Sequence, residues 1–161
     1  MLKLSKPIYY ILNYTWGLLL TVAGWILAFA LWITGHKAHR FGPCLVFQFG
    51  NVYWGGFSLG TTIVVDNDPE NIPKDKDDIS PLLNHEFGHS IQNALFGPFM
   101  LFLVSIPSMI RYWYMMSRAA DDPNYWAKVD YDAIWFEGTA TRWGTDNYEA
   151  VWRPKYDSES V

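Results

Sequence analysis

An uncharged run from residue 8 to residue 33 constrains the fold of this 161-residue chain more than any other feature. About 20 apolar residues are enough for a helix to cross the hydrocarbon core of a bilayer. Aromatic residues lie toward both ends of the run, as they do at membrane interfaces. They are Tyr9, Tyr10, Tyr14, Trp16, Trp25 and Trp32. The run therefore predicts an N-terminal transmembrane helix, with residues 1–40 as a membrane anchor.

A cleaved secretory signal is the alternative interpretation of this run. The apolar part of such a signal has about 7–15 residues, and small residues follow it at the cleavage site. Here the run is longer, and the sequence HKAHR at 36–40 follows it. The length favours an anchor that is retained. Lys3 and Lys6 before the run balance Lys37 and Arg40 after it, so the positive-inside rule predicts no orientation.

Charge and cysteine content narrow the possible functions. The net charge is −4, and residues 66–78 carry six acids against two lysines, so this one segment accounts for the imbalance. No basic patch indicates a nucleic-acid partner. The spacing of Asp66, Asp68 and Glu70 faintly resembles a calcium loop, but the required glycine is missing, and a solvated loop is favoured. Cys44 is the only cysteine, so no internal disulfide can form.

Local signals predict a mainly helical chain of the α+β class. Apolar and β-branched runs between residues 44 and 65, broken at Gly50 and at Gly55-Gly56, predict a small antiparallel hairpin. Ser80-Pro81 and Gly97-Pro98 delimit a helix over 81–96. A last helix is expected over 131–143, capped by Asp130 and closed by Gly144. The expected organisation is the anchor, a compact helical core at 41–146 and a polar tail at 147–161.

His85, Glu86 and His89 form an HExxH motif in the middle of the helix predicted over 81–96. Residues four apart lie on one helical face, so both imidazoles can bind one Zn²⁺. Glu86 lies beside them, where it can act as the general base that activates a zinc-bound water. Gln92 and Asn93 extend this polar stripe, and its ligand-type residues favour a buried site over a solvated face. The motif predicts a zinc-dependent hydrolase that acts on a peptide or protein substrate.

Catalytic zinc sites usually have a third protein ligand. Glu137 is the downstream acid that lies in the middle of a predicted helix, among the small or apolar neighbours Ala133, Ile134, Ala140 and Thr141. A carboxylate in such surroundings is costly unless it is paired or bound to a metal. A structural ion pair with Arg142 or Arg111 is the alternative. We favour Glu137 as the third ligand, because the small residues allow its helix to approach His85 and His89 closely.

The apolar segment at 99–116 must be compatible with this ligand set. It could form a second span, although it is short and Pro107 and Arg111 interrupt it. A complete span would place Glu137 on the other side of the membrane from His85. A re-entrant or surface-lying helical segment is therefore favoured.

Groups that support the chemistry are harder to identify from sequence. Residues 57–65 could present a strand edge to an extended peptide. Tyr131, Arg142 and His36 are candidates for stabilising the oxyanion by their chemistry alone.

Four short sequences resemble a group of small bacterial membrane-associated zincins of the gluzincin type. They are NHEFGHSIQ (84–92), FGP (96–98), IPS (106–108) and WFEGTA (135–140), and GGFSLG (55–60) adds to the likeness. The resemblance covers about residues 45–145. It implies His85, His89 and Glu137 as zinc ligands, Glu86 as the catalytic base, and a location in the bacterial cytoplasmic membrane. Many gluzincins carry Asp four residues after the ligand Glu, whereas this chain has Thr141 there.

Two other functions remain open at this level. Intramembrane proteases of the site-2 type also use HExxH, but they add an Asp in a Leu-Asp-Gly-like segment, which this chain lacks. A non-catalytic membrane protein could use the same residues for a structural zinc. Such a site is closed by a fourth residue, for which Cys44, His36 and His39 are the candidates.

Overall fold

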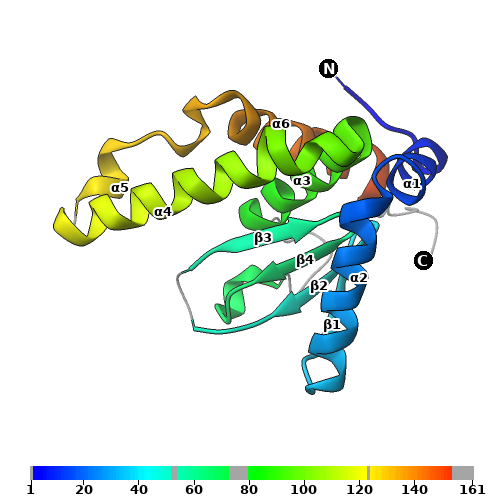
Figure 1. Cartoon of the computed structure of the whole chain (residues 1–161), viewed down its shortest axis with the longest axis horizontal. Helices are drawn as coiled ribbons and strands as arrows, with labels where there is room; N and C mark the ends of the chain where they lie inside the picture. Colours follow the sequence, from blue (N-terminus) through cyan, green and yellow to red (C-terminus); the bar gives the residue numbers. More distant parts are fainter. Residues whose placement is uncertain (1, 52–53, 73–79, 123, 154–161) are drawn as a thin grey trace, which may run out of the picture.

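The computed structural model describes residues 2–51, 54–72, 80–122 and 124–153. The chain is mainly helical and is built around a small mixed four-stranded sheet (Figure 1). The second part of the predicted acidic loop (73–78) and the end of the predicted tail (154–161) lie outside the described residues.

The predicted single helix over 8–33 is wrong. The run forms two helices, α1 (Lys6–Tyr14) and α2 (Leu18–Ile33), which meet at 87°. Within the described ranges, no helix by itself is long and apolar enough to cross a membrane. Two bent pairs reach the required length and composition together: α1 with α2, and Pro81–Phe99 with Leu101–Asp121, bent by 117°.

A buried polar cluster explains the bend between α1 and α2. Asn13 and Thr21 are fully buried and face Asn93 of helix α3 (Pro81–Phe96). The Asn93 Nδ2 donates to Asn13 Oδ1 at 2.7 Å and to the Gly17 carbonyl at 3.0 Å. A Cβ on Gly17 would lie 2.5 Å from Asn93 Nδ2, so only glycine allows this approach. The chain turns because these groups bind α3.

The sheet has the strand order β1-β2-β4-β3. Its strands are β1 (Ala38–Phe41), β2 (Cys44–Gln48), β3 (Gly56–Leu59) and β4 (Thr62–Val65). The predicted antiparallel hairpin between the runs at 44–49 and 57–65 is wrong: the second run splits into β3 and β4, which pair with each other antiparallel, and β4 pairs with β2 in parallel. The chain reverses at Gly60, which has a φ of +57°, and this places the fully buried β4 beside β2. The partly exposed β3 is left at the edge of the sheet.

Helices cover both faces of the sheet (Figure 1). On one face, Phe47 and Val64 pack against Ala28 and Leu31 of α2. Alternate residues point to the other face, where a larger core forms against α3. That core includes Val46, Ile63, Val65, Phe87 and Ile91. The sheet therefore holds α3 firmly from one side.

Helix α3 has the predicted bounds. The Ser80 Oγ accepts the Leu83 N–H at 3.2 Å, Pro81 occupies the first turn, and Gly97 ends the helix at a φ of +53°. A 3₁₀ turn (Gly97–Phe99) and a π-helical turn (Leu101–Ser105) then lead into α4 (Ile106–Asp121). Pro107 directly follows the π-helical turn, and α4 continues past it to Asp121, so Pro107 does not end the helical segment.

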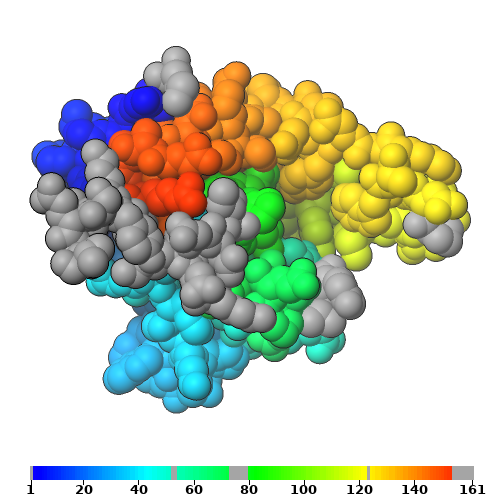
Figure 2. Space-filling model, turned by 180° about the vertical axis from the view of Figure 1, so that it is seen from behind, coloured from blue at the N-terminus to red at the C-terminus, as the bar shows by residue number. Residues whose placement is uncertain are grey.

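After α4 the chain returns to α3. The short helix α5 (Tyr125–Lys128) and the turn Tyr131–Ala133 lead into α6 (Trp135–Asn147), which packs along α3. Seen from behind, the α4–α5 end projects from the body of the molecule (Figure 2). The segment at 99–116 is thus helical as expected, and it does not separate Glu137 from the histidines.

Glycines allow α3 and α6 to touch. A Cβ on Gly88 would clash with the Ala140 carbonyl, and one on Gly144 would clash with the Asn84 carbonyl. The prediction that Gly144 closes the last helix is therefore wrong, because this glycine makes room for α3 inside a helix that continues to Asn147.

The first residues of the predicted polar tail pack on the rest of the chain. A π-helical turn (Tyr148–Trp152) follows α6, and Trp152 packs on Tyr9 and Phe87. Asn147 is buried and bonds the backbone near the N-terminus: its Oδ1 accepts the Leu4 N–H at 2.8 Å. These contacts join the two ends of the described chain.

Candidate metal centre

Three predicted ligand residues meet at one point between α3 and α6. The Nε2 atoms of His85 and His89 lie 3.1 and 3.3 Å from Glu137 Oε2, and 3.2 Å from each other. Glu137 is fully buried, His89 is nearly so, and His85 is partly exposed. In the described part of the chain, these residues form the group that could hold a metal ion.

The Nδ1 atoms of His85 and His89, which point away from Glu137, are both hydrogen-bonded. His85 Nδ1 lies 2.8 Å from Thr141 Oγ1, and the Thr141 hydroxyl donates to Asp132 Oδ1 at 2.9 Å. Because the hydroxyl proton is used there, Thr141 accepts from His85 Nδ1–H. The Nε2 of His85 then keeps its lone pair for the shared centre.

His89 is oriented in the same way by its own helix. Its Nδ1 lies 2.7 Å from Gln92 Oε1, while the Gln92 Nε2 donates to the Phe136 carbonyl at 2.7 Å and to Thr139 Oγ1 at 2.8 Å. The Gln92 amide must therefore accept from His89 Nδ1–H, which leaves the Nε2 lone pair free. Gln92 thus connects the ligand on α3 to the backbone of α6.

Glu137 is held by a hydroxyl on α4. Its Oε1 accepts from Ser108 Oγ at 2.5 Å, while its buried Oε2 makes no hydrogen bond of good geometry and faces the two imidazoles. The alternative ion pair with Arg111 or Arg142 is not formed in the described structure. Arg111 donates to the carbonyls of Asp130 and Tyr131, and Arg142 is exposed.

The three ligand atoms have the spacing that a metal requires. In tetrahedral zinc sites the metal lies about 2.0–2.2 Å from nitrogen and oxygen ligands, so the ligand atoms lie about 3.3 Å apart. The observed separations of 3.1, 3.2 and 3.3 Å agree with this value. The buried Oε2 without a hydrogen bond would also gain its missing partner. The donor set of two imidazoles and one carboxylate therefore fits a zinc ion.

For both Glu137 and His89, burial and the neighbouring charged groups shift the pKa in opposite directions. Burial would raise the pKa of Glu137, but His85, His89 and the Ser108 hydroxyl hold it well below its usual value. Burial alone would lower the pKa of His89, but the carboxylates of Glu137 and Glu86 raise it above its usual value. Glu137 is thus kept as a carboxylate, the form in which it binds a metal.

Glu86 does not join the ligand group. Its carboxylate is buried, and Oε2 has no hydrogen-bond partner in the described structure. Burial raises its pKa above the usual range, although the nearby histidines act against that shift. Glu86 is therefore a buried carboxylate beside His85 and His89, and its Oε2 is open to accept a proton.

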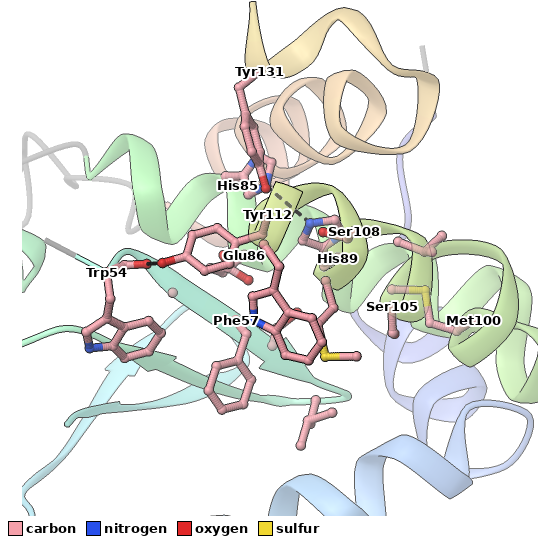
Figure 3. Close-up of a pocket in the computed structure, with 16 residues that line it drawn as sticks. Trp54, Phe57, His85, Glu86, His89, Met100, Ser105, Ser108, Tyr112 and Tyr131 are labelled. Carbon is pink, nitrogen blue, oxygen red and sulfur yellow. Dashed lines mark hydrogen bonds between the residues drawn. The ribbon is translucent and has the colours of Figure 1, made fainter. Parts of the chain in front are cut away.

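A cavity of about 420 Å³ opens beside these groups (Figure 3). His85, Glu86 and His89 form its polar wall. Its other walls come from Trp54, from the edge strand β3, from the segment 100–113 and from Tyr131. They include Trp54, Phe57, Ser58, Met100, Val104, Ser108, Met109, Tyr112 and Trp113. The fourth position of a metal held here would have space for a ligand from outside the protein.

One predicted oxyanion candidate reaches this cavity. Tyr131 lines it and points toward the histidines, with its ring 5.9 Å from that of His85 (Figure 3). Burial and the Glu137 carboxylate raise the pKa of its hydroxyl, which therefore stays protonated. His36 contacts Phe49 instead and does not line the cavity, and neither does Arg142.

Sequence reasoning did not identify four of the supporting groups. Ser108, Thr139 and Asp132 orient the site only after α4 and α6 have folded back. Thr141 was noted as a small neighbour of Glu137 and as a departure from the gluzincin pattern, whereas in the structure its hydroxyl bonds His85.

None of the predicted fourth ligands belongs to the described group. Cys44 is buried in β2, where its Sγ lies 3.5 Å from the Tyr9 hydroxyl, and neither His36 nor His39 joins the cluster. Comparisons of this chain with protein-family models, curated proteins and solved structures find no match. The geometry of the site therefore carries the functional argument alone.

Proposed function

We propose that the chain is a membrane-associated zinc-dependent metallopeptidase. The observation that carries this proposal is the convergence of His85 Nε2, His89 Nε2 and Glu137 Oε2 within 3.1–3.3 Å of one another, beside a cavity. A bound zinc ion would acidify a water and polarise a carbonyl group in that cavity.

Each residue of the site then has a distinct task. Glu86, buried and without a hydrogen-bond donor on Oε2, accepts a proton from the attacking water and transfers it to the leaving amine. Its raised pKa brings it closer to the pH at which both steps must occur. The protonated hydroxyl of Tyr131 donates a hydrogen bond to the oxyanion that develops on the substrate.

The rival functions have less support. A structural zinc needs a fourth ligand from the protein, and the described part of the chain supplies three residues and a cavity. A site-2-type protease would take an Asp as its third ligand, whereas Glu137 occupies that place. Both observations favour a site that leaves one position for water and substrate.

Replacing Glu86 with Gln tests the catalytic proposal. The Glu86→Gln variant should bind zinc as the wild type does, because Glu86 lies outside the ligand group. It should lose cleavage of a mixture of internally quenched peptides by about 10²-fold or more, because the proton acceptor is gone. Zinc content and initial rates are measured on the purified full chain. Glu149→Gln, an exposed glutamate on the turn after α6, is the matched control. Full activity in Glu86→Gln would refute the mechanism.

A further inference from the structure

The two bent helix pairs expose one connected apolar surface, which we call the outer apolar face. Large apolar side chains on α2 and on the segment after α3 are more than half exposed, among them Ile26, Phe29, Phe102, Ile110 and Trp113. The two parts meet where Trp16 contacts Phe99, with ring centroids 6.1 Å apart. Beneath them, Leu20 of α2 packs on Met100 and Val104. An exposed apolar surface of this extent is unusual on a water-soluble protein.

The metal-site cavity reaches the surface through this face. Three residues that line the cavity are also exposed: Trp113 by 61%, Met109 by 44% and Phe57 by 42%. Met109 and Trp113 belong to the outer apolar face of α4, and Phe57 lies on the edge strand β3 opposite them. We call these three side chains the apolar mouth.

The distribution of charge identifies what covers this face. No charged residue lies in α2 (Leu18–Ile33) or between residues 99 and 110. Lys3 and Lys6 precede the first stretch, and Lys37 and Arg40 follow it, all of them exposed. Apolar side chains bordered by basic ones fit a bilayer with anionic head groups. A symmetric pairing of two copies through this face would instead set the same basic border against itself.

We propose that the outer apolar face lies in a lipid bilayer, and that the substrate is an apolar peptide segment which enters the metal-site cavity sideways from the lipid through the apolar mouth. The second part rests on the proposed peptidase function. The first part does not.

The placement in lipid is tested with an environment-sensitive fluorophore on introduced cysteines. Phe29→Cys and Ile110→Cys label the outer apolar face, and Glu149→Cys is the control on the exposed turn after α6. Cys44 stays unlabelled at neutral pH, because burial raises the pKa of its thiol to about 11. The full chain is placed in mixed vesicles of phosphatidylcholine and phosphatidylglycerol. Brominated acyl chains should quench the labels at positions 29 and 110 severalfold and leave the label at position 149 unchanged. Unquenched labels at position 110, with or without cross-links between copies, would overturn the proposal.

Sideways entry is tested with matched substrates. One mixture of internally quenched peptides is made in a water-soluble form and in a palmitoylated form that inserts in the vesicles. Because insertion concentrates the peptide at the apolar mouth, its cleavage should be faster, on the order of 10²-fold. Equal rates would overturn sideways entry and leave the peptidase function intact. If neither form is cleaved, or zinc is absent, the proposed function fails, while the labelling result still stands.

A charge in the mouth should reduce this preference. Trp113→Asp is expected to lower the ratio of palmitoylated to soluble cleavage, because an apolar segment must then pass a carboxylate. Trp126→Asp is the control, since Trp126 is also exposed but does not line the cavity. Zinc content is measured in both variants to verify that the site is intact. An unchanged ratio in Trp113→Asp would show that the substrate takes another route.

Discussion

Soluble proteins usually bury apolar side chains and expose polar ones. Two regions of this molecule do the opposite: the interface between α3 and α6, and the outer faces of α2 and α4. Between α3 and α6, charged and polar groups such as Glu137 and Gln92 are buried, and the backbones touch at Gly88 and Gly144. On α2 and α4, large apolar side chains such as Phe29 and Ile110 are exposed.

Each arrangement has its own physical basis. Most of the buried polar groups are tolerated because they find hydrogen-bond partners. In the described structure the Oε2 atoms of Glu86 and Glu137 lack one; Glu137 belongs to the group that could hold a metal ion, and Glu86 lies beside it. Glu137 has Ser108 and two imidazoles, and Gln92 bonds a ligand on one helix and the backbone of the other. The exposed apolar groups are tolerated if lipid replaces water as their solvent. The candidate metal site thus depends on the close approach of the α3 and α6 backbones, whereas the exposed apolar side chains of α2 and α4 depend on the solvent around them.

The largest effect should follow from separating α3 and α6. Gly88→Val would drive a side chain into the Ala140 carbonyl, which belongs to rigid helical backbone. We expect a loss of about 4 kcal/mol or more in the free energy of unfolding, because neither helix can move without breaking the interface. Denaturant unfolding measures it, together with loss of bound zinc. Ala120→Val, on the exposed surface of α4, should change stability by no more than about 0.5 kcal/mol. A Gly88→Val protein as stable as the wild type would show that stability does not depend on the backbone contact between α3 and α6.

The next effect concerns the metal itself. Glu137→Ala removes the ligand that α6 contributes, so zinc affinity should fall by more than the about 100-fold that a lost supporting contact costs. Competition with a chelator gives the affinity, and elemental analysis gives the stoichiometry. Glu149→Ala should bind zinc as the wild type does, since this glutamate is exposed and outside the ligand group. An unchanged zinc affinity in Glu137→Ala would show that the metal does not bind between α3 and α6.

A third change tests how α1 and α2 are attached to the core. Asn93→Ala removes the donor to Asn13 Oδ1 and to the Gly17 carbonyl, both in the buried bend. Each acceptor left without a partner costs about 1–3 kcal/mol, so stability should fall by about 2–4 kcal/mol. The free energy of unfolding is measured against Asn124→Ala, an exposed asparagine before α5. No loss in Asn93→Ala would mean that the other contacts with α3, such as the Tyr9–Ser90 hydrogen bond, are enough to attach α1 and α2.

Local signals were enough to predict helix α3 and the close approach of the two histidines that it carries. Ser80, Pro81 and Gly97 act within one helical turn of the ends that they define, and the spacing of His85 and His89 is a property of the helix itself. The position of Glu137 close to the two histidines could be predicted because its small neighbours indicate a buried helix face. The Gly88 and Gly144 contacts confirm that this face lies against α3.

Features that depend on distant residues were predicted less well. The apolar run at 8–33 breaks because Asn13 and Gly17 bind Asn93, about 80 residues away in sequence. The chain reverses at Gly60, and either strand beside this turn could pair with β2. In the structure it is β4, in parallel, and β3 lies at the edge of the sheet. Gly144 has the composition of a helix stop, and only its contact with Asn84 shows its role. No window of local sequence contains these partners.

The smallest effect tests whether a hydroxyl can replace the carboxylate of many gluzincins at position 141. The Thr141 hydroxyl accepts a hydrogen bond from His85 Nδ1–H and donates one to Asp132. Thr141→Val therefore removes the acceptor for His85 Nδ1–H while keeping the shape of the side chain. Zinc affinity should fall by about tenfold, the lower end of the cost of such supporting contacts. Thr141→Ser should restore it, and Thr145→Val, one helical turn later on α6, should have no effect. Wild-type affinity in Thr141→Val would mean that the packing of α6 against α3 alone orients His85, and the α3–α6 interface would then need no polar relay to hold its metal.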